Sequence, residues 1–171
     1  YNIGHNLQNI KNFNPNIVVT NYAISQDNEE LIWAKRNKKK IFSRSEILGK
    51  LSKDFKNVIA ISGTHGKTTT TALISEILIE AKQKPTVHIG GILKRTQSNF
   101  LIGNKKFFIT EACEYKNSFL SLFPTVGVVL NTEADHLDFF KDFSDIKNSF
   151  NIFLQQSKIQ IFPKDEFSFI L

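Results

Sequence analysis

The stretch that decides the fold is Val58-Ile59-Ala60-Ile61-Ser62-Gly63-Thr64-His65-Gly66-Lys67-Thr68-Thr69-Thr70-Thr71. Its apolar start is rich in β-branched side chains and indicates a buried strand. A short glycine-containing loop and a Lys-Thr pair follow. The next apolar residues recur at helical spacing: Leu73, Ile74, Ile77, Leu78 and Ala81. Strand, glycine loop, Lys-Thr and helix, in this order, are typical of a phosphate-binding loop.

Each part of this loop suits an anion. Gly63 and Gly66 allow the backbone to approach a phosphate closely, and the free N–H groups and dipole of the following helix favour negative charge. Lys67 adds a positive charge for the terminal phosphates, and the Thr68 hydroxyl can bind magnesium. Because Ile61 stands where the common pattern has another glycine, a strand–turn–helix without a ligand remains the alternative. The predicted nucleotide loop consists of Gly63, Thr64, His65, Gly66, Lys67, Thr68 and Thr69.

Composition limits the classes of protein. Hydrophobic residues make up 41% and charged residues 22% of the 171 positions, which fits a globular chain with a core. No apolar run approaches the ~20 residues of a membrane span. The single Cys113 excludes an internal disulfide framework and fits a reducing compartment. The net charge of +6 suits a polyanionic small substrate but could also suit nucleic acid. Because the sequence carries no aromatic nucleic-acid motif and no membrane-spanning run, we expect a cytoplasmic protein with small-molecule substrates and no nucleic acid or membrane partner.

Alternating patterns predict an α/β fold with parallel sheets and flanking helices. The first part has strands at 16–20 and 41–42, a helix at 28–35 and a helix capped by Ser43 or Ser45. A polar connector at 54–57 separates it from the rest, so we expect domains at residues 1–55 and 56–171. After the nucleotide loop, further strands are expected at 86–89, 107–110 and 125–130, with a turn at Gly90-Gly91 and a last helix capped by Ser144.

Polar residues follow two of these strands. In parallel sheets ligands bind beyond the carboxyl ends of the strands, where Glu111 and His136 fall. We interpret both as metal ligands, with a purely structural histidine as the alternative for His136. Cys113 is expected to be a small buried residue and not a nucleophile, since no histidine partner is evident. The remaining acids are expected to be solvated loop residues: Glu114, Glu133 and Asp138.

Four motifs together carry a resemblance to a known family. They are the nucleotide loop with its Gly-Thr-His-Gly-Lys-Thr-Thr sequence, His88-Ile89-Gly90-Gly91, Glu111-Ala112-Cys113-Glu114-Tyr115, and Asn131-Thr132-Glu133-Ala134-Asp135-His136-Leu137-Asp138. This set resembles the Mur ligases, which build the peptide stem of bacterial peptidoglycan. Gly4-His5, Ala23-Ile24 and Asn28-Glu29-Glu30-Leu31 resemble the end of the family's Rossmann-like UDP-binding domain. Residues 56–171 would then be the first part of a P-loop ATPase domain.

The resemblance implies an ATP- and Mg²⁺-dependent ligase that joins L-alanine to UDP-N-acetylmuramate through an acyl phosphate. By the same resemblance, Lys67 would neutralise the β- and γ-phosphates, Thr68 and Glu111 would hold one magnesium, and His136 would hold a second magnesium or a bridging water. Lys67, Glu111 and His136 are thus the expected catalytic residues. The Gly90-Gly91 pair, with Lys94 nearby, would approach the sugar diphosphate.

Departures from the family pattern leave two alternatives open. Asn21-Tyr22 replaces a common Ser-Ser, and Cys113 stands where the family often has an acid. The glycine-rich uridine-diphosphate loop, the adenine contacts and the C-terminal domain are absent, so we expect the 171-residue chain alone to be inactive. The absence of Met and the apolar end at 167–171 suggest a piece of a longer protein. The alternatives are the related ligase that attaches a recycled tripeptide and a nucleotide-binding fragment without activity.

Overall fold

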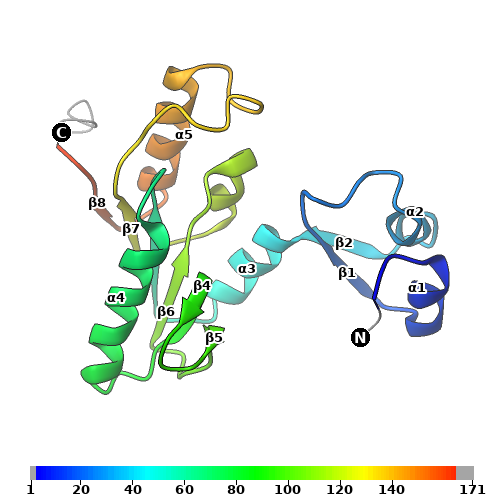
Figure 1. Ribbon diagram of the computed structural model, residues 1–171, viewed down its shortest axis with the longest axis horizontal. Coiled ribbons are helices and arrows are strands. Elements are labelled where there is room, and N and C mark those ends of the chain that lie inside the picture. The colour runs from blue at the N-terminus through cyan, green and yellow to red at the C-terminus, as the bar shows by residue number, and fades with distance from the viewer. Residues whose placement is uncertain (1–2, 165–171) are drawn as a thin grey trace. The chain divides into compact units, whose positions relative to one another are not determined.

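The computed structural model describes residues 3–164. It divides into two compact units, Tyr1–Leu48 and Gly49–Leu171 (Figure 1). This division falls within helix α3 (Arg44–Ser52), several residues before the boundary expected from the polar connector. The assignment of residues 1–55 and 56–171 to two family domains stays a prediction, because compactness alone does not define such domains.

The first unit has a small parallel sheet flanked by helices. Its elements are α1 (Leu7–Phe13), β1 (Ile17–Thr20), α2 (Glu29–Arg36), β2 (Lys40–Ser43) and the start of α3. Strands β1 and β2 pair in parallel, with Ile17 opposite Lys40. A parallel pair needs a crossover connection, which α2 supplies. The sequence patterns did not predict α1, whose cap is the side chain of Asn6.

Side-chain caps fix where the next two helices begin. The Asn28 side chain accepts hydrogen bonds from the N–H groups of Glu30 and Leu31 at the start of α2. At α3, Ser43 Oγ accepts from the N–H of Glu46, and the Glu46 carboxylate accepts from the N–H of Ser43. This reciprocal pair is a capping box, which satisfies N–H groups that a helix start leaves without partners. Of the two predicted cap residues of α3, Ser43 is therefore the one confirmed.

The second unit is built on a six-stranded sheet in the order β5-β4-β6-β3-β7-β8 (Figure 1). Its elements are β3 (Asn57–Ser62), α4 (Lys67–Glu80), β4 (Thr86–Leu93), β5 (Ser98–Leu101), β6 (Phe107–Glu111), the 3₁₀ helix η1 (Tyr115–Ser121), β7 (Val126–Val129), α5 (Phe143–Gln155) and β8 (Ile159–Ile161). All neighbouring strands are parallel except β4 and β5. The predicted α/β fold is confirmed, and β3 lies at the centre of the sheet.

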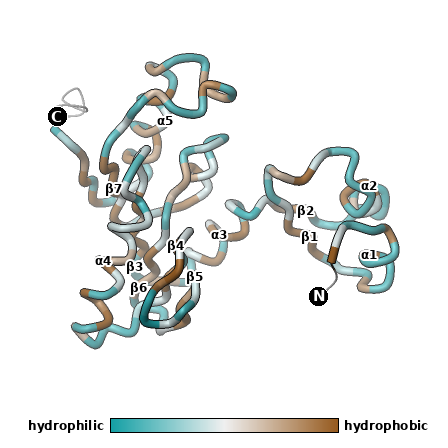
Figure 2. The backbone as a smooth tube through the Cα atoms, viewed as in Figure 1, coloured by the Kyte–Doolittle hydropathy of each residue, from teal (hydrophilic) through white to brown (hydrophobic). Residues whose placement is uncertain are grey.

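The strands carry the main hydrophobic core, and Figure 2 shows brown hydrophobic segments in these strands and in α4. One face of the sheet packs against α4. Its buried cluster consists of Ile61, Val87, Ile89, Leu93, Ile109 and Val128, and Ala72, Ile74 and Leu78 of α4 pack against it. Alternate strand residues point to opposite faces, so one set of β-branched residues anchors the helix that begins with Lys67.

The other face holds an aromatic cluster. Phe119 of η1 stacks on Phe153 of α5 at 4.9 Å between ring centroids, and Phe150 meets Phe119 edge-on at 5.3 Å. All three side chains are buried. Gly127 of β7 allows this close packing, because a Cβ there would lie 2.1 Å from Ser157 Oγ. The central strands are therefore packed on both faces of the sheet.

The helix predicted after the loop is confirmed as α4, although its Leu73 and Ile77 are 60% and 66% exposed, because the core faces the neighbouring positions of the helix. Two local expectations were wrong. Strand β4 continues through Gly90 and Gly91 instead of turning there. Asp142, not Ser144, caps α5 through the N–H of Asp145. The apolar stretch at 167–171 lies outside the described residues. Within residues 3–164, no helix is long and apolar enough to cross a membrane.

Candidate functional site

The nucleotide loop connects the carboxyl end of β3 to α4. Gly63 has φ +133° and Gly66 has φ +83°, and both values lie where side chains are strained. A Cβ on Gly63 would also come within 3.1 Å of Leu130. Gly66 caps α4, so the first helical N–H groups, at Lys67 to Thr69, have no carbonyl partner within the helix. The two glycines therefore perform the backbone role expected from the sequence.

Asn131, at the end of β7, holds the middle of this loop in place. Its Oδ1 accepts a hydrogen bond from His65 N at 2.8 Å, and its Nδ2 donates to His65 O at 3.2 Å. Its backbone oxygen accepts from Thr64 N at 3.2 Å. The two chain segments are 66 residues apart in sequence, so sequence spacing gave no sign of this contact.

A second pair of contacts joins the loop to Glu133. Thr64 Oγ1 accepts a hydrogen bond from Glu133 N at 2.9 Å. The Glu133 carboxylate lies 3.4 Å from His65 Nε2, with both side chains more than half exposed. Such an exposed pair contributes little to stability. The side chain of Glu133 is thus a solvated loop acid, as predicted. Its backbone N–H, which donates to Thr64, makes the stronger contact with the loop.

Lys67 is folded back onto its own loop. Its Nζ donates to the carbonyl oxygens of Gly63 and Thr64 and to Glu114 Oε1, the last at 3.0 Å. An ammonium group has three protons to donate, so these three acceptors use all of them. The ammonium group is therefore placed at the loop's own carbonyls, beside the start of α4.

Glu114 contradicts its prediction as a solvated acid. The residue is only 4% exposed. One carboxylate oxygen binds Lys67, while the other, Oε2, is buried without a hydrogen-bond partner among the described residues. Burying a carboxylate is costly unless the charge is paired, so the ion pair with Lys67 accounts for the burial. Sequence reasoning missed this residue because nothing local distinguishes it from an exposed loop acid.

His136 lies next to the same carboxylate. Its Nε2 is 3.8 Å from Glu114 Oε1, and its ring packs on Tyr115 with centroids 4.7 Å apart. The Tyr115 hydroxyl donates to Asp138 at 3.0 Å, and this hydrogen bond raises the pKa of Tyr115 above its ordinary value. His136 itself has φ +55°, an uncommon value for a non-glycine residue. Asp138 is exposed, as expected.

Glu111 lies in a neighbouring group of contacts. Its Oε1 accepts from Gly90 N at 2.7 Å. A Cβ on Gly90 would lie 3.0 Å from Glu111 Oε2, and a Cβ on Gly91 would lie 2.9 Å from Thr68 Cγ2. The two glycines of β4 therefore leave space for Glu111 and for the second residue of α4. A larger residue at either position would crowd these side chains, which explains why glycine, normally unfavourable inside a strand, occupies both.

The structure thus divides the predicted site residues into two groups. Lys67 and His136 meet through Glu114, whereas Thr68 and Glu111 lie against the β4 glycines. Within residues 3–164, no group of three or more His, Cys, Asp or Glu side chains is arranged as a metal site. Cys113 is exposed, which contradicts the expected burial.

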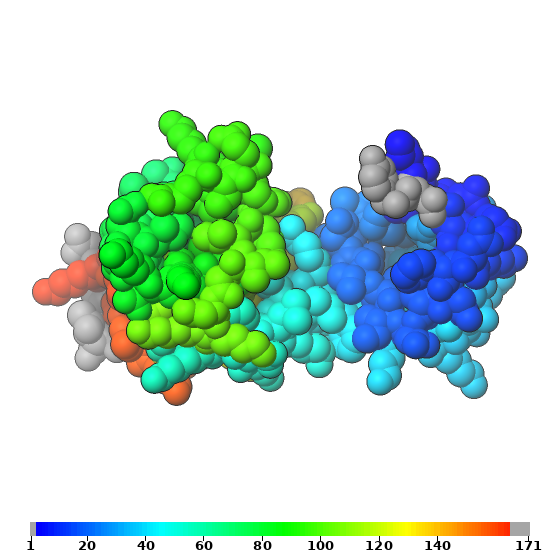
Figure 3. Space-filling model, turned by 90° about the horizontal axis from the view of Figure 1, so that it is seen from below, coloured from blue at the N-terminus to red at the C-terminus, as the bar shows by residue number. Residues whose placement is uncertain are grey.

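A cavity of about 460 Å³ lies elsewhere, at the amino ends of the parallel strands. Its lining includes Ile79 at the end of α4, Pro85 before β4 and Leu101 of β5. Figure 3 shows the green surface that α4 and the β4–β5 hairpin form on this side. Ligands of parallel sheets bind at the carboxyl ends of the strands. We therefore place the candidate site at the nucleotide loop and not at this cavity.

Comparison with curated proteins finds similar sequences over most of the chain. Among curated relatives, the UDP-N-acetylmuramate–L-alanine ligase of Clostridium botulinum is 49% identical over 163 residues, covering 95% of this chain and 34% of that protein. The enzyme of the same name from Caldicellulosiruptor bescii is 53% identical over 154 residues, covering 90% and 33%. The chain thus spans about a third of the length of these relatives.

Solved structures agree with the fold. The crystal structure of UDP-N-acetylmuramate-alanine ligase from Thermotoga maritima matches with a TM-score of 0.87 and 25% identity, covering 98% of this chain and 40% of that one. A Neisseria ligase for UDP-N-acetylmuramate and a tripeptide has a TM-score of 0.80 at 23% identity, which supports the fold alone. Residues 61–169 match the Mur ligase middle domain, and because this is more than half of the chain, the protein belongs to the Mur ligase family.

Proposed function

We propose that this chain carries the ATP-binding loop of a cytoplasmic ligase that joins L-alanine to UDP-N-acetylmuramate. The observation that carries the proposal is the loop after β3, with Lys67 and the free N–H groups of α4 at the carboxyl edge of the sheet. The relatives with 49% and 53% identity bear the name of that activity. The chain spans only about a third of the length of these relatives, so we state the reaction and its substrates as part of the proposal.

In the proposed reaction, a carboxylate oxygen of the muramic acid attacks the γ-phosphorus of ATP, and ADP leaves. The amine of L-alanine then attacks the acyl carbon, the C–O bond to phosphate breaks, and the amine gives up a proton. Positive charge from Lys67 and the helix N–H groups would stabilise the charge that develops on the phosphoryl oxygens. Protein groups mainly hold the reactants in place, which contributes much of the rate gain.

The oxygen-rich side chains at the loop suit Mg²⁺. The hydroxyl of Thr68 and the carboxylate of Glu111 are ligands that this ion prefers, and His136 would serve a second ion or a bridging water. Glu114 also has a buried carboxylate oxygen with no hydrogen-bond partner within residues 3–164, which favours a cation nearby. Bound magnesium would offset phosphate charge during transfer. Gly90 and Gly91, with Lys94, would approach the sugar diphosphate.

The tripeptide-adding relative is the second candidate. The solved L-alanine and tripeptide ligases are similarly distant from this chain, at 25% and 23% identity, but the curated relatives at 49% and 53% identity bear the name of the L-alanine ligase. We therefore favour L-alanine. A chimaera tests this choice: residues 1–171 replace the matching third of the Caldicellulosiruptor bescii ligase. Phosphate release that requires L-alanine would support the proposal, and release that requires the tripeptide would reverse it.

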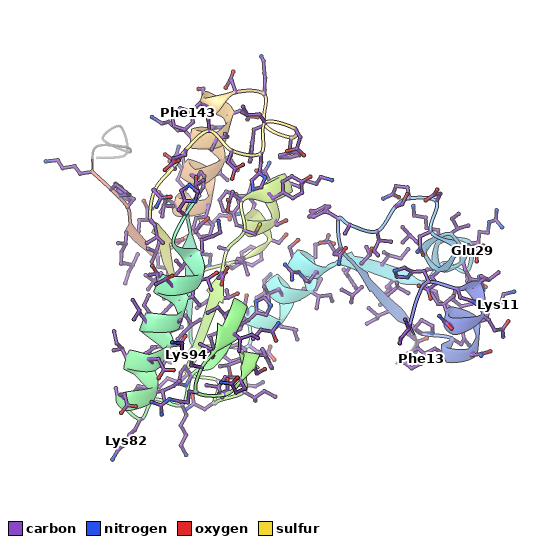
Figure 4. The ribbon with its side chains drawn as sticks, viewed as in Figure 1. Lys11, Phe13, Glu29, Lys82, Lys94 and Phe143 are labelled. Atoms are coloured by element: carbon purple, nitrogen blue, oxygen red, sulfur yellow. The ribbon has the colours of Figure 1, made fainter. Side chains whose placement is uncertain are left out.

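Calorimetric titration with magnesium-ATP tests nucleotide binding directly. Lys67→Ala should abolish binding, because Lys67 is the only lysine or arginine of the loop. Lys82→Ala is the matched control, since it removes the same charge at the opposite end of α4 (Figure 4). Equal ATP affinity of wild type and Lys67→Ala would reject the proposal.

A further inference from the structure

The contact between Lys67 and Glu114 has a direct bearing on phosphate binding. Lys67 is the group expected to bind the terminal phosphates, yet its three donors are already used by Gly63 O, Thr64 O and Glu114 Oε1. At least one of these bonds must break before Lys67 can donate to a phosphate oxygen. The two carbonyls are neutral, whereas the carboxylate is an anion at 3.0 Å. Glu114 is therefore the main competitor of phosphate for Lys67.

The surroundings of Glu114 allow it to release Lys67. Oε2 is buried without a partner among the described residues, so the carboxylate is only half satisfied while it binds Lys67. A buried carboxylate that served only stability would gain from bonds to both oxygens. His136 Nε2 lies 3.8 Å from the oxygen that Lys67 uses. A second polar nitrogen therefore already faces the oxygen that Lys67 would leave.

We propose that Glu114 is a positioning residue that holds Lys67 folded back in the ligand-free protein and releases it to the phosphates of an incoming nucleotide. This inference rests on the proposed nucleotide function and names a regulation of that same loop. Its energetic consequence is simple. The nucleotide must displace the carboxylate, so the observed affinity is lower than the loop alone would give.

Glu114→Gln is the informative variant, because it keeps the size of the side chain and removes its charge. A hydrogen bond to a charged group is stronger than one to a neutral group by a margin that corresponds to about tenfold in affinity. We therefore expect Glu114→Gln to bind pyrophosphate and magnesium-ATP about tenfold more tightly than wild type, as measured by calorimetry. Unchanged or weaker binding in this variant would overturn the inference.

Two controls separate the contact from a general charge effect. Glu114→Asp keeps the negative charge but withdraws the carboxylate by one methylene from Lys67, so it should behave like Glu114→Gln. If instead Glu114→Asp matches wild type, charge alone is responsible and the proposed contact is wrong. Glu76→Gln removes a carboxylate from α4 that pairs with Arg95, and its affinity should stay within about twofold of wild type because screening weakens exposed charges. Thermal melting of each variant verifies that it folds.

The state of Lys67 can be observed without any ligand. In NMR spectra that detect lysine ammonium groups, Lys67 should give a protected signal in wild type, lose it in Glu114→Gln, and shift it when pyrophosphate is added. A Lys67 signal that is identical in wild type and Glu114→Gln would contradict the contact. If wild type and Glu114→Gln both fail to bind pyrophosphate and ATP, the nucleotide function and the displacement fail together. If wild type binds and Glu114→Gln binds equally, only the displacement fails.

Discussion

Replacing Asn131 with alanine tests whether the tertiary contact shapes the nucleotide loop. The substitution removes two hydrogen bonds to the backbone of His65, of 2.8 and 3.2 Å. Each contributes about 1 kcal/mol net, so the loop loses about 2 kcal/mol of its preference for the observed conformation. If that conformation is the one that binds phosphate, magnesium-ATP affinity falls by up to about 30-fold.

The matched control lies at the other end of the same sheet. Asn57 begins β3, and its Nδ2 donates to Lys106 O at 3.0 Å. Asn57→Ala therefore removes a comparable amide–backbone bond far from the loop, and it should leave ATP affinity within about twofold of wild type. Calorimetric titration gives the affinities, and thermal melting gives the stabilities. The reasoning is refuted if Asn131→Ala binds ATP as wild type does while both variants melt at similarly reduced temperatures.

Other expectations address the metal, the core, acid stability and the chain itself. Glu111→Ala and His136→Ala should weaken the magnesium dependence of activity in the ligase chimaera more than nucleotide binding; an unaltered magnesium titration would remove them as ligands. Phe150→Ala should lower the free energy of unfolding by about 3–5 kcal/mol in denaturant titrations, because this ring is fully buried. Burial acts to raise the pKa of Glu30, but hydrogen bonding and charge from His5 outweigh it and lower this pKa below 4.5. The charged Glu30 therefore stabilises the first unit above pH 4.5, and this contribution is lost as the pH falls through the lowered pKa. The melting temperature of Glu30→Gln should therefore approach that of the wild type in acid. A difference in melting temperature that stays constant with pH would refute this. The chain alone should release no phosphate from ATP with UDP-N-acetylmuramate and L-alanine, and turnover near 1 per second, an ordinary enzyme rate, would contradict that.

The sequence determined the features that depend on neighbouring residues. The apolar run before Gly63 and the spacing after Lys67 specify strand, loop and helix, because strand and helix periods are local properties of the chain. Asn28 and Ser43 likewise begin their helices through bonds within three residues. The order of these elements also predicts a parallel sheet, since crossovers by helices permit little else. Family membership follows from such motifs and is confirmed by the match over residues 61–169.

Only the tertiary structure decided which polar residues surround the nucleotide loop. Glu114 and Asn131 reach Lys67 and His65 across 47 and 66 residues of sequence, and Cys113, next to Glu114, is exposed instead of buried. Burial of a side chain depends on which segments pack over it, and no local period records that. The same holds for α4, where packing on the sheet leaves Leu73 and Ile77 exposed. Local residue spacing therefore predicted where the nucleotide loop lies in the sequence. Only long-range packing determined that the carboxylate of Glu114 binds Lys67.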